Sequence, residues 1–282
     1  MDEKLIAQIV EEVIRQLQAV QTQGGQKPTC SACEDITSPA CKAVPLLKAQ
    51  DPEALLRMKR KTNARIGVGK AGARLNTQTM LTLRADHAQA RDAVFVDVNP
   101  QVLEDLGLFT VQTRCEDKNT YVTRPDLGRT LSKEAVKTLK EKCVMNPDVQ
   151  IYAADGLSST AIQVNLPKIL PVLMDSLKAK GLKVGTPFFL RFGRVGSQEH
   201  VAETLGAKVV CVLIGERPGL ATAESMSAYI AYNAYVGMPE SKRTVVSNIH
   251  KDGTAAVEAG AYVADVIEMI LDQKASGVEL VK

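Results

Sequence analysis

Short turns in the C-terminal half of this 282-residue chain carry side chains that could recognise a ligand. Carboxylates and hydroxyls can accept hydrogen bonds from ligand hydroxyls, and arginine forks can bind phosphate or carboxylate groups. The side chains concerned are Asp155, Ser158, Ser159, Arg191, Arg194, Glu216 and Arg217. A single arginine of this kind is more often an ordinary surface or interface partner. Three arginines at neighbouring strand ends favour a polyanionic or nucleotide-like ligand.

Each of these turns follows a short apolar run that is typical of a buried strand. The runs are 149–154, 184–190, 209–214 and 244–246, and helical patterns separate some of them. Continuous apolar strands are typical of a sheet that is covered on both faces. In such open α/β sheets, ligands bind outside the carboxyl ends of the strands. The sequence therefore predicts a Rossmann-like α/β fold whose turns line one binding edge.

The chain lacks the usual sequence marks of a complete catalytic site. It has no Gly-x-Ser-x-Gly or His-Glu-x-x-His motif and only three histidines. The segment from Asn248 to Gly253 differs by one residue from Asp-x-His-x-x-Gly, in which cobalamin enzymes coordinate cobalt through the histidine. Asn248 lacks the charge of that aspartate, which normally orients the ring. We therefore predict no catalytic residue in this chain and no cobalt ligation by His250.

Composition argues against several classes of partner. The formal net charge is only +3, tryptophan is absent and aromatic residues make up 4% of the chain, so nucleic acid is not an expected partner. No apolar run approaches the roughly 20 residues needed to span a bilayer, and no secretory signal is evident.

Three clustered cysteines leave two alternatives open. Cys30, Cys33 and Cys41 could be reduced thiols in a linker or an incomplete zinc site.

The N-terminal part predicts a helix on a tether. Residues 1–19 place apolar side chains at helical spacing along one stripe, and residues 20–44 have the composition of a flexible linker. Such a helix could fold back on the body, support an oligomer interface or dock on another protein. The sequence predicts a small basic helical domain over residues 45–130 and the α/β domain over residues 131–282.

The small domain contains a run of basic residues. Residues 57–84 include eight lysines and arginines and no acidic side chain. The glycine-rich stretch Arg65–Arg74 is only superficially like a phosphate loop, because Lys70 is followed by Ala71. The basic run leaves a second hypothesis open, namely a non-catalytic regulatory protein that binds nucleotides or nucleic acid through residues 57–84.

Several longer segments together resemble one known family. They are Thr123–Gly128, Asn146–Val149, Asp155–Ser158, Gly181–Phe188, Gly215–Leu220, Ser247–His250 and Gln273–Gly277. The chain resembles the small (light) subunit of ethanolamine ammonia-lyase in register over its whole length, including the tethered N-terminal helix.

The resemblance implies a function and a set of site residues. The family binds adenosylcobalamin at the interface with a large subunit, and the complex converts ethanolamine to acetaldehyde and ammonia by radical chemistry. Its cobalamin-contacting positions fall on Val195, Glu216 and Val245, and we add Arg194 and Ser247 from the same turns. Relatives vary at Val245, so a main-chain contact is expected there. The family is usually cargo of a bacterial microcompartment, which gives the N-terminal helix a role in binding shell or cargo proteins.

Overall fold

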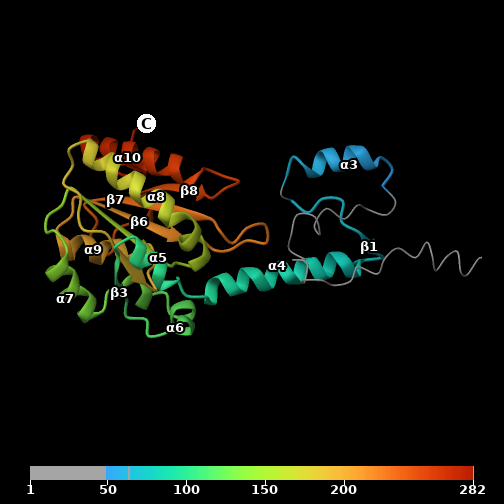
Figure 1. Cartoon of the computed structure of the whole chain (residues 1–282), viewed down its shortest axis with the longest axis horizontal. Helices are drawn as coiled ribbons and strands as arrows, with labels where there is room; N and C mark the ends of the chain where they lie inside the picture. Colours follow the sequence, from blue (N-terminus) through green and yellow to red (C-terminus); the bar gives the residue numbers. More distant parts are fainter. Residues whose placement is uncertain (1–48, 63, 282) are drawn as a thin grey trace, which may run out of the picture.

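The computed structural model describes residues 49–62 and 64–281. The predicted N-terminal helix and linker, residues 1–19 and 20–44, lie outside the described residues. The described chain consists of a sheet with helices on both faces and an arm that projects from it (Figure 1). The α/β class predicted from the sequence is confirmed, and the sheet is mixed.

The main sheet has six strands in the order β3-β5-β4-β6-β7-β8. They are β3 (Phe109–Gln112), β4 (Val149–Ala154), β5 (Phe188–Arg191), β6 (Val209–Gly215), β7 (Met226–Tyr232) and β8 (Arg243–Ile249). The first four in sheet order pair in parallel, and β7 is antiparallel to both of its neighbours. The carboxyl ends of β3, β4, β5, β6 and β8 therefore share one edge with the amino end of β7, as the binding-edge hypothesis requires.

Two layers of helices cover the sheet. On one face lie α8 (Ser159–Ala179) and α10 (Ala256–Gln273); on the other lie α7 (Lys133–Lys142) and α9 (Ser197–Leu205) (Figure 1). Both layers are needed because successive side chains of β4 point to opposite faces of the sheet and are apolar on both. Ile151 and Ala153 pack into the first core, whereas Tyr152 and Ala154 pack into the second. Full burial of each large apolar side chain contributes roughly 1.5–3 kcal/mol to folding.

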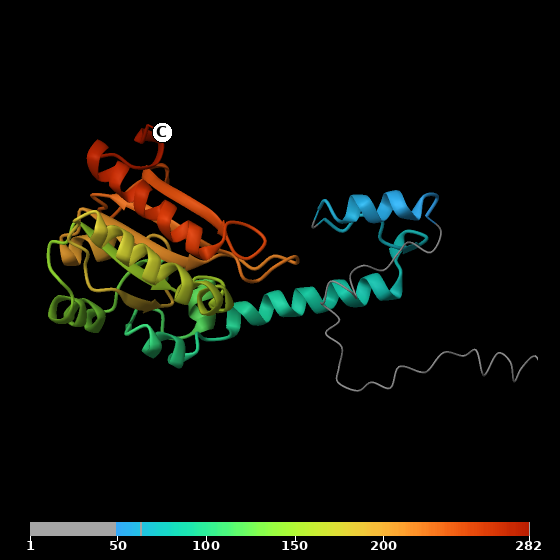
Figure 2. The same cartoon turned by 45° about the horizontal axis from the view of Figure 1, so that its top comes forward.

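The arm consists of α3 (Pro52–Lys59), the short strands β1 (Lys70–Ala71) and β2 (Arg74–Leu75), and α4 (Thr77–Phe95). Figure 2 shows α4 extending away from the sheet, with α3 beside its far half. Asp51 and Asn76 cap the two helices through their side chains. Arg65 forms an ion pair with the buried Asp86 and also donates to the carbonyl of Leu220, in the β6–β7 loop. One residue of the predicted anion-binding run is thus engaged within the fold.

Several elements differ from the sequence-based expectation. Strands β3 and β7 were not predicted, and β5 begins at Phe188 rather than at residue 184. Residues 100–130 belong to the region predicted as a small helical domain. They contain α5 (Pro100–Asp105), α6 (Lys118–Thr123) and η1 (Leu127–Arg129), but also β3, which pairs with β5. The part of the chain before residue 131 is therefore not wholly helical, while the domain limits stay a prediction. Two further short helices are η2 (Glu240–Lys242) and η3 (Gly277–Glu279).

Candidate functional site

An open pocket of about 390 Å³ lies at the shared strand-end edge of the sheet. The turns after β4, β5 and β6 contribute to it, together with β7 and the segment that contains α6 and η1. Its lining residues are Tyr121, Arg129, Gly156, Leu157, Arg194, Val195, Gly196, Ile214, Gly215, Glu216, Arg217, Tyr229 and Glu240. The pocket brings together three of the five predicted cofactor-binding residues: Arg194, Val195 and Glu216.

Glu216 stands directly after β6 and is held from the neighbouring strand. Its Oε1 accepts a hydrogen bond of 2.9 Å from the hydroxyl of Tyr229, and its backbone N–H donates to the carbonyl of Ser225. Burial, with the nearby carboxylate of Glu216, raises the pKa of Tyr229 to about 12. Tyr229 therefore stays protonated and donates at neutral pH. One carboxylate oxygen is oriented by this bond, and Oε2 has no protein hydrogen bond among the described residues.

Arg194 is fixed against an aromatic ring. Its guanidinium lies 4.5 Å from the centre of the Tyr121 ring and donates to the carbonyl of Tyr121 at 2.7 Å. Its backbone N–H donates to the carbonyl of Gly128. The Nε of Arg194 is buried without a hydrogen-bond partner among the described residues. The next residue, Val195, adds an apolar wall that packs on the core beneath.

A buried ion pair lies at the end of β4, next to the same turn. Lys118, at the start of α6, lies 3.1 Å from Oδ2 of Asp155, and Oδ1 of Asp155 accepts from the backbone N–H of Gly193 at 3.2 Å. Burial raises the pKa of Asp155, and the nearby Lys118 opposes that shift. Both carboxylate oxygens are thus used within the fold. The prediction that Asp155 recognises ligand hydroxyls directly is therefore wrong.

Two glycines allow the turns of the pocket to meet closely. Gly156 has φ of +56° and Gly215 ends β6. A Cβ on Gly156 would overlap the carbonyl oxygen of Gly215, and one on Gly215 would overlap that of Ser158. The backbone of the β4 turn therefore lies directly against the residue that precedes Glu216.

Other predicted ligand groups have structural roles. Ser158 caps α8 and donates to the carbonyl of Ala223, and Ser159 is fully buried, so neither hydroxyl reaches the pocket. Arg191 pairs with Asp97 at 2.8 Å and lies over the Phe192 ring, away from the pocket lining. The predicted ligand contact is therefore wrong for Ser158 and Ser159, and Arg191 lies outside the pocket lining.

Val245 and Ser247 lie on β8, outside the pocket lining. Val245 is opposite Tyr229 in the strand pairing and is 42% exposed. Ser247 is exposed where the pairing of β8 with β7 shifts register. Both therefore flank the pocket, with Tyr229 between β8 and Glu216.

The near-motif at His250 forms a closed loop. The backbone N–H of Asp252 donates to Nδ1 of His250, which leaves Nε2 protonated to donate to Oδ1 of Asn248 at 2.7 Å. His250 is buried, and Asn248 adopts φ of +62°. Both ring nitrogens therefore hold the turn after β8.

Residues that the sequence reasoning missed form the other side of the pocket. Tyr121 and Arg129 come from the region predicted as a small basic helical domain, and Tyr229 comes from β7, which was not predicted as a strand. The segment Met226–Tyr232 is mostly apolar and contains two tyrosines and an isoleucine, residue types that favour strands, so its composition could have revealed this strand.

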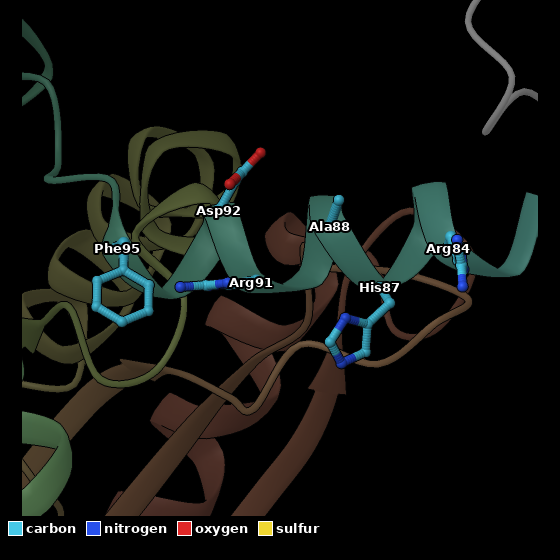
Figure 3. A pocket seen from close by; sticks show the side chains of 6 residues that line it. All are labelled: Arg84, His87, Ala88, Arg91, Asp92 and Phe95. Carbon is cyan, nitrogen blue, oxygen red and sulfur yellow. The ribbon is translucent and has the colours of Figure 1, made fainter. Parts of the chain in front are cut away.

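A second hollow of about 470 Å³ lies along α4 and is shown in Figure 3. Arg84, His87, Arg91 and Phe95 stand on one side of the helix there, and all four side chains are exposed. This surface lacks the convergent elements that build the strand-end pocket. In residues 49–62 and 64–281 no three His, Cys, Asp or Glu side chains gather as a metal site would require. No described helix has the length and hydropathy to cross a membrane.

A helix-covered sheet with an open pocket at its strand ends defines an α/β protein with a candidate ligand site at that edge. The family model described as ethanolamine ammonia-lyase light chain (EutC) matches residues 52–281. The chain belongs to the ethanolamine ammonia-lyase small-subunit family, as the sequence resemblance predicted.

Curated relatives named ethanolamine ammonia-lyase small subunit cover most of the chain. The protein of Fusobacterium nucleatum is 60% identical over 248 residues, which is 88% of this chain and 84% of the relative. That of Clostridium perfringens is 51% identical over 286 aligned positions, covering 99% of this chain and 97% of the relative. That of Lachnoclostridium phytofermentans is 46% identical over 99% of each chain. The chain is thus the small subunit of a carbon–nitrogen lyase, which implies a large-subunit partner.

Proposed function

We propose that the strand-end pocket binds adenosylcobalamin and that this chain covers the cofactor at the interface with the large subunit. The complex then converts ethanolamine to acetaldehyde and ammonia by a radical mechanism. The observation that carries the proposal is the convergence of Arg194, Val195 and Glu216 in one pocket. The family resemblance assigns cofactor contact to Val195 and Glu216, and it does so independently of the fold. A Rossmann-like use of the sheet, with the ligand at the carboxyl ends of its strands, follows from this proposal.

The residues present fit the chemistry of this cofactor. Glu216 offers a carboxylate oxygen to ribose hydroxyls or amide N–H groups. Arg194 has a buried Nε without a protein partner among the described residues, and Arg217 is an exposed cation at the same edge. Val195, Leu157 and Ile214 offer apolar surface to the macrocycle. The pocket thus combines acceptor, cationic and apolar groups.

The role of this chain is binding and orientation. Bound adenosylcobalamin supplies the cobalt–carbon bond whose homolysis starts the radical reaction, and proteins around such cofactors supply position and protection. Glu216, held by Tyr229, fixes one side of the ligand, and Arg194, held by Tyr121, fixes another. The apolar side chains exclude water between them. We assign no proton transfer and no substrate contact to this chain.

Strand β8 extends the proposed site beyond the pocket. It is the last strand in the sheet order, so its outer edge has backbone groups that no neighbouring strand of the sheet engages. Val245 and Ser247 are both exposed there. A backbone contact from Val245 and a hydroxyl contact from Ser247 would complete the predicted cofactor-binding set.

Family membership favours this function over the alternative of a regulatory nucleotide- or nucleic-acid-binding protein. The basic run 57–84 lies in the arm, and its Arg65 is engaged by Asp86. We further propose that residues 1–19 act as a packaging peptide for shell or cargo proteins of a bacterial microcompartment. Deletion of residues 1–20 should abolish packaging and leave lyase activity in free solution intact. Loss of activity after the deletion would contradict this role.

Co-purification tests the proposed function. Co-expressed with a large subunit, the chain should give a complex that binds adenosylcobalamin, detected by its visible spectrum, and that releases ammonia from ethanolamine. The purified chain with cofactor alone should show no turnover. A complex that does not retain the cofactor, or turnover by the isolated chain, would contradict the proposal.

A further inference from the structure

Lys118 and Asp155 form a buried ion pair that makes no direct contact with the pocket. Asp155 is buried, and the Lys118 side chain is only 10% exposed. Neither residue is among those that line the pocket. Replacing a buried ion pair with apolar residues is often neutral or stabilising, because desolvation of the two charges offsets their attraction. Burial raises the pKa of Asp155 despite the nearby Lys118, in agreement with such a cost.

The pair connects three elements at the edge of the sheet. Asp155 follows β4, Lys118 begins α6, and Gly193 belongs to the turn after β5. One carboxylate oxygen of Asp155 is bonded to Lys118 and the other to the N–H of Gly193. The ammonium group also lies 5.4 Å from the centres of the Tyr121 and Phe192 rings. The pair therefore connects the β5 turn to α6.

The β5 turn needs such support because its backbone is unusual. Phe192 has φ of +58°, the left-handed region that side chains other than glycine rarely adopt. The carbonyl of Phe192 accepts from the hydroxyl of Thr113 at 3.0 Å, and the carbonyl of Gly193 accepts from the hydroxyl of Tyr121 at 3.2 Å. Arg194 comes next, and it packs on the same Tyr121 ring. The conformation at Phe192 and Gly193 thus sets where Arg194 and Val195 meet the pocket.

We propose that Asp155 and Lys118 form a positioning pair that sets the turn 192–195 from beneath and so places Arg194 and Val195 for the ligand. The ligand in this statement rests on the proposed function. The two residues touch no ligand themselves and act through the backbone of Gly193 and the ring of Tyr121.

Paired substitutions separate positioning from packing. Lys118→Met with Asp155→Leu removes both charges and both hydrogen bonds while keeping apolar bulk. Lys118→Gln with Asp155→Asn restores a neutral version, in which the asparagine oxygen accepts from Gly193 and its amide donates to glutamine. Lys208→Gln with Asp148→Asn is the matched control, since this lysine–aspartate pair of 2.8 Å lies at the amino end of the same strand β4.

Two measurements are made on each complex with the large subunit. The first is the dissociation constant of adenosylcobalamin, and the second is amide hydrogen exchange of residues 192–195, read by mass spectrometry. The Met/Leu pair should weaken cofactor binding about tenfold, a typical effect of losing an oriented charged contact, and speed exchange in the turn. The Gln/Asn pair should recover most of the cofactor affinity and most of the protection from exchange. The control pair should change neither the affinity nor the exchange rate. Turnover at saturating cofactor should be largely kept in all three.

Unchanged affinity and exchange in an assembled Met/Leu complex would overturn the proposal. Should that variant fail to assemble, Asp155→Asn beside an intact Lys118 serves instead, because the amide NH2 then replaces one of the two accepting oxygens and faces a donor, either Lys118 or the N–H of Gly193. Wild-type affinity and exchange in Asp155→Asn would overturn the proposal equally. If the wild-type complex binds no adenosylcobalamin, the proposed function fails, while exchange in the turn still decides whether the pair positions it.

Discussion

The hydroxyl of Tyr229 donates a hydrogen bond of 2.9 Å to Oε1 of Glu216 and thereby connects β7 to the end of β6. In the register of the two strands Tyr229 pairs with Val212, four residues before Glu216, so the long Tyr229 side chain and the Glu216 side chain meet along the end of β6. Tyr229 also pairs with Val245 on β8. Glu216 is thus oriented by a residue that is itself fixed between two strands, which favours a defined carboxylate geometry in the pocket.

Tyr229→Phe should weaken cofactor binding through Glu216. The ring and its packing are kept, and only the donor to Oε1 is lost, so the protein should fold normally. A hydrogen bond to a charged group contributes about 1.5–3 kcal/mol net. The substitution leaves the bond between Glu216 and the ligand in place and removes only its orientation by Tyr229, so we expect cofactor affinity to fall about three- to tenfold. A double-mutant cycle with Glu216→Gln should give a combined effect smaller than the sum of the two. Strict additivity in the cycle would mean that Tyr229 does not act through Glu216.

Gly156→Ala should disturb the pocket more than a comparable glycine substitution elsewhere. Gly156 (φ +56°) and Gly107 (φ +65°) carry the same backbone penalty, but only at Gly156 would a Cβ overlap a neighbouring backbone, that of Gly215. Gly107→Ala should therefore lower the melting temperature modestly and leave cofactor affinity unchanged. Gly156→Ala should lower both, because Gly215 precedes Glu216. Equal cofactor affinity in the two variants would contradict the claim that close contact between Gly156 and Gly215 positions Glu216.

The fold was predictable where local pattern and burial agree. The continuous apolar runs at β4 and β6 mark strands covered on both faces, and both are buried throughout. Strand β3 is only four residues long, which is too short to show a recognisable alternation of apolar and polar residues. Local pattern fails in α8, because proline normally breaks or kinks a helix, yet α8 continues through Pro167 and Pro171. Buried Leu166, Leu170 and Leu173 anchor it against the sheet, so tertiary packing offsets the missing backbone donors.

The site was predictable only in part, because strand ends indicate which turns share an edge but not which side chains face outward. Glu216 and Arg194 follow their strands and reach the pocket, whereas Asp155 follows β4 and points into the interior toward Lys118. Lys118 lies 37 residues from Asp155 in sequence, and no local pattern links the two. Tyr229 belongs to the site through the antiparallel pairing of β7 with β6, and composition that favours a strand does not specify that pairing.

Asp148 should contribute to stability in a pH-dependent way. The hydrogen bond from Lys208, together with one from the backbone of Lys183, holds its pKa below the ordinary value. Such a group stabilises the fold above its unfolded pKa of about 3.9, and that contribution is lost as pH falls through the lower folded value. The melting temperature of wild type minus that of Asp148→Asn should therefore be positive near neutral pH and shrink below about pH 4. Calorimetry of the complex across this range tests it; a constant difference would contradict it.

His250→Ala should leave the cobalt environment unchanged. Both ring nitrogens of His250 are engaged by Asn248 and Asp252, so the histidine is a structural element of its loop. The substitution should lower the melting temperature, because it removes two hydrogen bonds and opens a buried space. The visible spectrum of bound cobalamin in the variant complex should match that of wild type. A spectral change characteristic of an altered axial ligand would show that His250 reaches the metal.

Titration of adenosylcobalamin into complexes that contain Glu216→Gln and Glu216→Ala tests the cofactor role of this subunit most directly. Glutamine keeps one acceptor and the shape, so affinity should fall about tenfold, which corresponds to about 1.4 kcal/mol, and alanine should lower it further. Turnover at saturating cofactor should be largely preserved, because Glu216 holds the ligand and is not asked to stabilise the transition state. Wild-type affinity in both variants would contradict cofactor binding at the strand-end pocket, and a collapse of turnover at saturation would contradict a purely binding role.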